Sequence, residues 1–219
     1  MKRIVKICGL THVVSVDAAI LAGADALGFV FSDSARQVTA RHAAFIASRV
    51  PRHVLRVAVM RSPEVELWRE VQEIFCPDVL QTDSADFDYL DVPQDIQRWP
   101  VVREGEPATA RDVADVFVYE GPSSGRGEKV DWQVAAGVAK KGRMILAGGL
   151  DADNVAKALE TVMPWGVDVS SGVESTPGVK DPDLIHAFVA AVRATETAAS
   201  ERASTLSGIV EHVPKGPLP

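Results

Sequence analysis

The sequence has little of what several classes of protein require. Only two of its 219 residues are cysteine, Cys8 and Cys76, so we expect no disulfide framework. No apolar run approaches the roughly 20 residues of a membrane span, and no small-residue cleavage site follows the first residues, so we expect a cytosolic protein without a membrane partner. Its 23 basic residues are scattered and outnumbered by 30 acidic ones, which argues against a nucleic-acid partner.

Two signatures of cofactors and metals are missing as well. No G-x-G-x-x-G follows the first apolar run, where an open dinucleotide-binding sheet would carry it. The histidines show no spacing typical of metal ligands, so we expect no metal site. They are His12, His42, His53, His186 and His212.

What the sequence does have is a regular alternation of short apolar runs with stretches of helical spacing. Eight short runs rich in β-branched residues are candidate strands, and most of them are apolar throughout rather than alternately. Strands buried on both faces of a parallel sheet have this pattern. The runs are 3–7, 26–31, 54–60, 78–81, 99–103, 115–120, 143–148 and 167–170.

Stretches with helical spacing lie between these runs. The clearest covers 63–76, with Ser62 as its predicted cap and Pro63 at its first position, and 181–195 repeats the pattern. The fourth and fifth connections are short and poorly marked. Weaker helical patterns occupy 13–22, 40–49, 131–141 and 151–163.

Eight strands alternating with helices predict a single-domain (β/α)₈ TIM barrel over residues 1–195, in the α/β class. The alternative is an open doubly wound sheet, which the missing glycine motif disfavours. Residues 196–219 are rich in Thr, Ser, Ala, Pro and Gly, and predict a disordered tail.

In such a barrel the reactive groups come from the carboxyl ends of the strands. The first strand ends at Cys8, which is either a thiol that exchanges protons at the mouth of the barrel or a small buried hydrophobe. Spacing alone does not separate these two interpretations. His12 follows closely and could tune such a thiol, whereas Cys76 lies on the apolar face of a helix and is expected to be core.

The loops after the second and sixth strands carry two further candidates. Arg36 could clamp a carboxylate or a phosphate, or simply be solvated. Glu120 ends the sixth strand before a glycine-rich loop long enough to act as a lid. It is placed to serve as an acid or a base, or it is a surface glutamate at a turn.

Small residues follow the last two strands, and they predict a phosphate site. Backbone N–H groups can approach an anion closely there, and these two loops often hold phosphate in barrels of this fold. Local dipoles would supply the attraction that the net charge of −7 does not. The residues are Gly148, Gly149, Ser170, Ser171 and Gly172.

Read in order, these strand ends resemble the phosphoribosylanthranilate isomerase family. The matching pieces are KICGLT at 6–11, ALGFVF with SAR at 34–36, LAGGLDADNV at 146–155 and GVDVSSGVESTPGVKDP at 166–182. The resemblance implies a (β/α)₈ barrel without cofactors that catalyses an Amadori rearrangement in tryptophan biosynthesis. It implies that Cys8 is the general base, that Glu120 stands where the family has an acidic aspartate, that Arg36 holds the anthranilate carboxylate, and that the five small residues hold the 5′-phosphate of the phosphosugar substrate.

Several positions depart from the family pattern. Glu120 is longer than the family's aspartate, and Ala35 replaces a proline. Residues 81–84 read Gln-Thr-Asp-Ser where the family has Gln-Leu-His-Gly. In the lid, Ser124 replaces a glycine and Arg126 replaces a small hydroxyl residue. These departures keep open a barrel that binds phosphosugars without turnover, or one with a different phosphosugar substrate. The length is compatible with a monomer or a homodimer.

Overall fold

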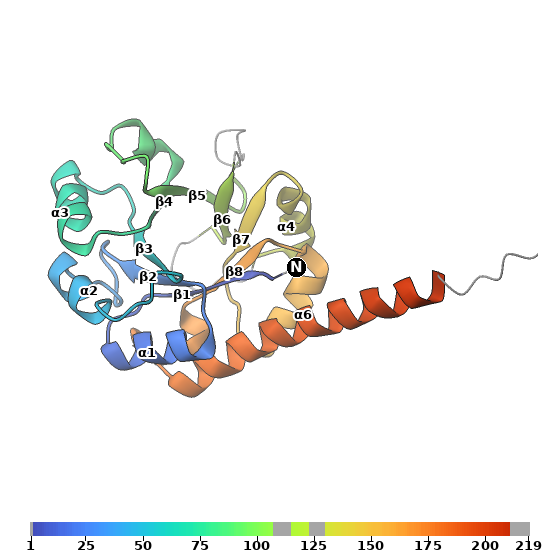
Figure 1. The fold of residues 1–219 in the computed structure, drawn as a ribbon. Helices are drawn as coiled ribbons and strands as arrows, with labels where there is room; N and C mark the ends of the chain where they lie inside the picture. The colour runs from blue at the N-terminus through green and yellow to red at the C-terminus, as the bar shows by residue number, and fades with distance from the viewer. Residues whose placement is uncertain (1, 107–114, 123–129, 211–219) are drawn as a thin grey trace, which may run out of the picture.

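The computed structural model describes residues 2–106, 115–122 and 130–210, and from residue 199 onward the backbone alone. Eight parallel strands form a closed barrel, in which each strand pairs with the next and β8 pairs with β1 (Figure 1). The predicted barrel and its eight strands are confirmed, and the open sheet is wrong. The strands are β1 Ile4–Cys8, β2 Ala26–Val30, β3 Leu55–Val59, β4 Val79–Asp83, β5 Gln97–Arg103, β6 Val116–Glu120, β7 Arg143–Leu146 and β8 Gly166–Val169.

Helices form in all six stretches that showed helical spacing. They are α1 Val13–Ala22, α2 Ala40–Ile46, α3 Val65–Phe75, α4 Trp132–Ala139, α5 Val155–Val162 and α6 Pro182–Val210. The fourth connection contains only the short 3-10 helix η1, Ser84–Asp88, and the fifth includes residues 107–114, outside the described part of the chain. After β8 come a second 3-10 helix, η2 Ser171–Val173, and a hairpin of β9 Glu174–Thr176 and β10 Val179–Lys180.

α6 runs past residue 195, the predicted end of the barrel domain, and continues to Val210. The sequence predicts a disordered tail from residue 196, whereas the structure has residues 196–210 in a helix. Residues 211–219 lie outside the described part of the chain. The division of the chain at residue 195 stays a prediction.

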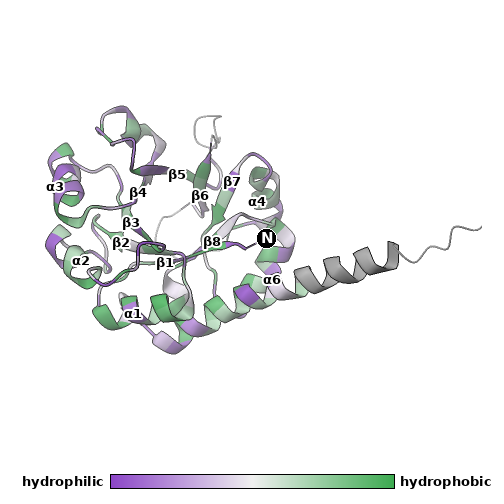
Figure 2. Cartoon of the chain, in the orientation of Figure 1, coloured by the Kyte–Doolittle hydropathy of each residue, from purple (hydrophilic) through white to green (hydrophobic). Residues whose placement is uncertain are grey.

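Most of the strands are buried on both faces, which explains their apolar character, whereas β5 begins with the exposed Gln97 and Arg98 and is partly hydrophilic (Figure 2). One apolar cluster lies between the strands and the surrounding helices. A smaller cluster fills the interior of the barrel and includes Ala26, Val57, Val79, Trp99 and Ile145. Because apolar side chains fill this part of the interior, polar side chains gather where the strands end.

Charged contacts reinforce the junction at which the barrel closes. Arg193 on α6 donates from Nη2 to Asp25 Oδ2 at 2.6 Å and from Nη1 to the carbonyl of Arg3 at 2.8 Å. The backbone N–H of Val5 donates to the same Asp25 oxygen at 2.9 Å. Burial would raise the pKa of Asp25, but the hydrogen bonds from Lys2, Val5 and Arg193 outweigh burial and lower it. Among the described helices, none is long and apolar enough to cross a membrane.

Candidate active site

A cavity of about 270 Å³ opens at the carboxyl ends of the strands. Seven of the eight site residues predicted from the sequence line it, and they come from five different strand ends. Gly172 does not line the cavity, but it packs against Leu150, which does. The lining set comprises Cys8, Arg36, Glu120, Gly148, Gly149, Ser170 and Ser171.

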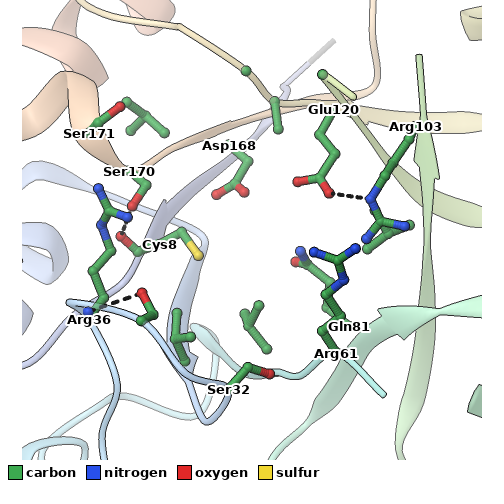
Figure 3. A pocket seen from close by; sticks show the side chains of 18 of the residues that line it. Cys8, Ser32, Arg36, Arg61, Gln81, Arg103, Glu120, Asp168, Ser170 and Ser171 are labelled. Carbon is green, nitrogen blue, oxygen red and sulfur yellow. Dashed lines mark hydrogen bonds and ion pairs between the residues drawn. The ribbon is translucent and has the colours of Figure 1, made fainter. Parts of the chain in front are cut away.

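Cys8 is the last residue of β1 and borders the cavity, although only 7% of its surface is exposed. Gly28, its partner in β2, leaves room for the thiol, because a Cβ at that position would lie 2.9 Å from the Cys8 Sγ. Glu120 lies across the cavity from Cys8, with Asp168 between them (Figure 3). The two groups that the sequence singled out for acid and base chemistry therefore face one space.

A buried ion pair lies beside the thiol. Lys6 precedes Cys8 by two residues and therefore points to the same face of β1. Its Nζ lies 2.9 Å from Asp168 Oδ1 on β8, and the Lys6 side chain is completely buried. Burial raises the pKa of the Cys8 thiol, and the Lys6 ammonium opposes part of that rise. His12, by contrast, is exposed, and its Nδ1 lies 2.8 Å from Thr11 Oγ1.

Glu120 meets an arginine that the sequence reading overlooked. Arg103, the last residue of β5, lines the cavity, and its Nε lies 3.3 Å from Glu120 Oε1. The same guanidinium donates from Nη2 to Asp83 Oδ1 at 2.6 Å. Burial would lower the pKa of Arg103, but the Asp83 and Glu120 carboxylates outweigh it and raise that pKa. A cationic group thus lies directly beside the candidate acid.

Arg36 reaches the cavity with its guanidinium already engaged. Its Nε and Nη2 donate to the two carboxylate oxygens of Glu174, at 2.7 and 2.8 Å. Lys180 donates to Glu174 Oε1 at 2.7 Å, so one buried carboxylate joins two cations. Burial would raise the pKa of Glu174, but these hydrogen bonds lower it. A guanidinium has five N–H donors, so Arg36 can bind a further acceptor while it keeps its two hydrogen bonds to Glu174.

The two loops predicted to bind phosphate lie side by side. Gly148 and Gly149 have φ values of 95° and 63°, a left-handed backbone that glycine adopts without strain. Ser170 links the other loop to the carboxyl end of β1, because its hydroxyl donates to the Cys8 carbonyl at 3.1 Å and its carbonyl accepts from Lys180 at 2.9 Å. Gly172 packs so closely on the Leu150 carbonyl that any Cβ there would overlap with it.

Five polar residues at or beneath this site escaped the sequence reading. They are Lys6, Arg103, Asp168, Glu174 and Lys180. A signal existed for three of them, since Lys6, Arg103 and Asp168 are charged residues inside or at the end of strands of the parallel barrel, whereas Glu174 and Lys180 lie in the hairpin after β8. The predicted lid residues Ser124 and Arg126 lie outside the described part of the chain. Within the described residues no group of three His, Cys, Asp or Glu side chains could hold a metal ion.

A closed parallel barrel with a thiol, a carboxyl group and two small-residue loops at one end has the architecture of a phosphate-binding (β/α)₈ enzyme. The sequence profile of the N-(5′phosphoribosyl)anthranilate (PRA) isomerase family matches residues 5–191. The chain belongs to this family.

Relatives and solved structures agree with the assignment. The N-(5′-phosphoribosyl)anthranilate isomerase of Listeria welshimeri is 37% identical over 209 residues, which cover 88% of this chain and 100% of the relative. That of Streptococcus pneumoniae is 38% identical over 193 residues, covering 86% and 95%. The crystal structure of TrpF from Jonesia denitrificans is 34% identical with a TM-score of 0.75, covering 89% of this chain and 98% of that one.

A further solved structure is a phosphoribosyl anthranilate isomerase in complex with reduced 1-(o-carboxyphenylamino)-1-deoxyribulose 5-phosphate. It is 28% identical with a TM-score of 0.72, and the match covers 88% of this chain and 100% of that one.

Proposed function

We propose that this chain is the isomerase that converts N-(5′-phosphoribosyl)anthranilate into the corresponding aminoketose in tryptophan biosynthesis. The observation that carries the proposal is the placement of Cys8 and Glu120 on facing walls of one cavity bordered by the two small-residue loops. An aldose-to-ketose shift needs an acid, a base and a fixed substrate. The site offers candidates for all three.

In this proposal the phosphate binds at the loops of β7 and β8. Gly148, Gly149, Ser170 and Ser171 border the cavity there, and Gly172, which has no side chain, allows its loop to approach the Leu150 carbonyl closely. Small residues allow main-chain N–H groups to approach the phosphate oxygens. The phosphate would thereby fix the sugar between the two walls.

The reaction then needs four proton transfers, the first two of which are assigned to Glu120 and Cys8. Glu120 gives a proton to the furanose ring oxygen, the C1′–O bond breaks, and the nitrogen lone pair forms a C=N bond with C1′, which leaves a protonated imine. The Cys8 thiolate removes the C2′ proton, and the released electron pair forms the C1′=C2′ bond while the nitrogen regains its lone pair. Transfer of a proton to C1′ and loss of the C2′ hydroxyl proton give the ketone. Atoms and electrons balance without a redox partner.

Arg36 is proposed to bind the anthranilate carboxylate. It lines the same cavity as Cys8, and Glu174 fixes its guanidinium through two hydrogen bonds. A planar guanidinium suits a carboxylate because it can donate two parallel hydrogen bonds. The carboxylate would join Glu174 as a second acceptor.

The test is steady-state kinetics of Cys8→Ser and Glu120→Gln with the anthranilate substrate. Each variant should lose at least about 100-fold in kcat while substrate binding survives. Cys76 is exposed at the end of α3, so the expectation that it lies in the core was wrong. Cys76→Ser is the matched control, because Cys76 does not line the cavity, and it should keep full activity. Full activity in Cys8→Ser or in Glu120→Gln would contradict the role of that residue, and binding without turnover in the unaltered chain would favour a non-catalytic barrel.

A further inference from the structure

Three neighbouring strands each contribute their last residue to one charged row. Arg103 ends β5, between Asp83 at the end of β4 and Glu120 at the end of β6. Its Nη2 donates to Asp83 Oδ1 at 2.6 Å. Its Nε lies 3.3 Å from Glu120 Oε1, a contact that Figure 3 marks. Only 8% of Arg103 is exposed. One nearly buried guanidinium therefore bridges two carboxyl groups, one of which is the proposed acid.

The two contacts are unequal. The hydrogen bond from Arg103 to Asp83, at 2.6 Å, is shorter than the 3.3 Å contact between Arg103 and Glu120. Asp83 also faces Arg61, whose Nε lies 3.9 Å from Asp83 Oδ2. A guanidinium beside a carboxyl group favours its charged form and so opposes its use as a proton donor. A second carboxylate that binds the same guanidinium weakens this effect. Asp83 is placed to act in this way.

This row also connects two departures from the family pattern. The acid is a glutamate, one methylene longer than the usual aspartate, and residue 83 is an aspartate where the pattern has histidine. A longer side chain has one more rotatable bond and needs a contact to fix it. The Arg103 contact supplies that constraint, and Asp83 supplies the compensating charge.

We propose that Arg103 and Asp83 are positioning residues for Glu120: Arg103 fixes the carboxyl group at the cavity wall, and Asp83 offsets the charge of Arg103 so that Glu120 retains its proton. The inference rests on the proposed function, in which Glu120 is the acid. Arg103→Met removes a positive charge beside Glu120, and Asp83→Asn removes a negative charge beside Arg103, so the two variants change the local charge in opposite directions.

Other titratable groups surround the row and stay constant in the test. Among the described residues, those that line the cavity or act on Arg103 are Cys8, Asp33, Arg36, Asp168 and Glu106. Shifts of opposite sign in two variants cannot come from this unchanged background.

The experiment measures kcat against pH for the unaltered chain, Arg103→Met, Arg103→Lys and Asp83→Asn. If Glu120 must be protonated, kcat falls above its pKa in the enzyme–substrate complex. Arg103→Met should move that fall to higher pH by about one unit and lower the maximal kcat about 10-fold, because the charge and the constraint are both lost. Asp83→Asn should move the fall to lower pH by about one unit, because the charge of Arg103 is no longer offset.

Two further variants test for a merely structural role. Arg103→Lys keeps the charge and should restore the position of the fall, with a kcat nearer to that of the unaltered chain. Asp78→Asn is the matched control. Asp78 directly precedes β4, at the opposite end of the barrel from the cavity, and its Oδ2 lies 3.1 Å from Arg56 Nε. It should leave the pH profile unchanged.

Unmoved profiles, or shifts in the same direction for Arg103→Met and Asp83→Asn, would overturn the inference. Circular dichroism and a melting curve establish that each variant folds. If Arg103→Met fails to fold, a downward shift in Asp83→Asn with an unshifted profile in Arg103→Lys supports the inference, and any other combination overturns it. Failure of the proposed function gives a different result, since Glu120→Gln would then keep full activity.

Discussion

Replacing Lys6 with methionine should destabilise the barrel and make the Cys8 thiol harder to ionise. The Lys6 side chain is completely buried and lies 2.9 Å from Asp168, so the variant leaves a carboxylate in the interior without its partner. Breaking a buried ion pair in this way typically costs about 3 to 5 kcal/mol. The Asp168 side chain keeps 9% of its surface exposed at the cavity, so we expect the lower end, about 3 kcal/mol.

A loss of that size lowers the melting temperature of a chain of this length by about 6 to 12 °C. Urea unfolding gives the free energy, and Lys2→Met is the matched control. Lys2 also pairs with an aspartate, Asp25, but 68% of its side chain is exposed, so its loss should cost no more than about 1 kcal/mol. The double variant Lys6→Met with Asp168→Leu should recover much of the stability, because no unpaired charge remains.

The thiol provides a second measurement on the same variant. In a Cys76→Ser background, the rate of alkylation by iodoacetamide reports the ionised fraction of Cys8. Because the Lys6 ammonium lowers the pKa of this thiol, the alkylation profile of Lys6→Met should move to higher pH. The reasoning is refuted if Lys6→Met costs less than about 1 kcal/mol, or if the double variant is no more stable than the single one.

Two further predictions concern a glycine and an aspartate. Gly172→Ala should raise KM about 10-fold, because its Cβ would push the two loops of the phosphate site apart; Gly137→Ala in α4, where a Cβ meets nothing within 4 Å, is the control and should keep KM unchanged. Asp25→Asn should lower the free energy of unfolding by about 1 to 2 kcal/mol at pH 7 but hardly at pH 2. The folded chain lowers the pKa of Asp25, so its contribution is present above the unfolded value of about 3.9 and is lost as the pH falls through the folded value. Equal losses at both pH values would contradict this assignment.

The fold was largely predictable because a closed parallel barrel leaves a strong pattern in the sequence. A strand such as β2, buried on both faces, has to be apolar along its whole length. The same topology brings all strand ends together, which is why residues as distant as Cys8 and Ser171 could be placed at one site. Their roles in catalysis and binding remain predictions.

What the sequence did not reveal depends on contacts between strands. Arg103 and Asp83 meet because of the register of β4 against β5, which no local pattern encodes. The predicted start of α3 was wrong for the same kind of reason. Ser62 does not cap the helix, since its backbone N–H donates to Asp86 Oδ2 at 3.0 Å, and α3 begins at Val65 rather than at Pro63.

The placement of the thiol on β1 and of the carboxyl group on β6 has a consequence for how activity depends on assembly. A nick between β5 and β6 would leave each fragment with one of the two reacting groups and neither with a complete cavity. Turnover recovered on mixing such fragments would report that the cylinder had closed again. Under the roles proposed for Cys8 and Glu120, turnover therefore requires the closed ring of strands, and neither of these two fragments alone should show it.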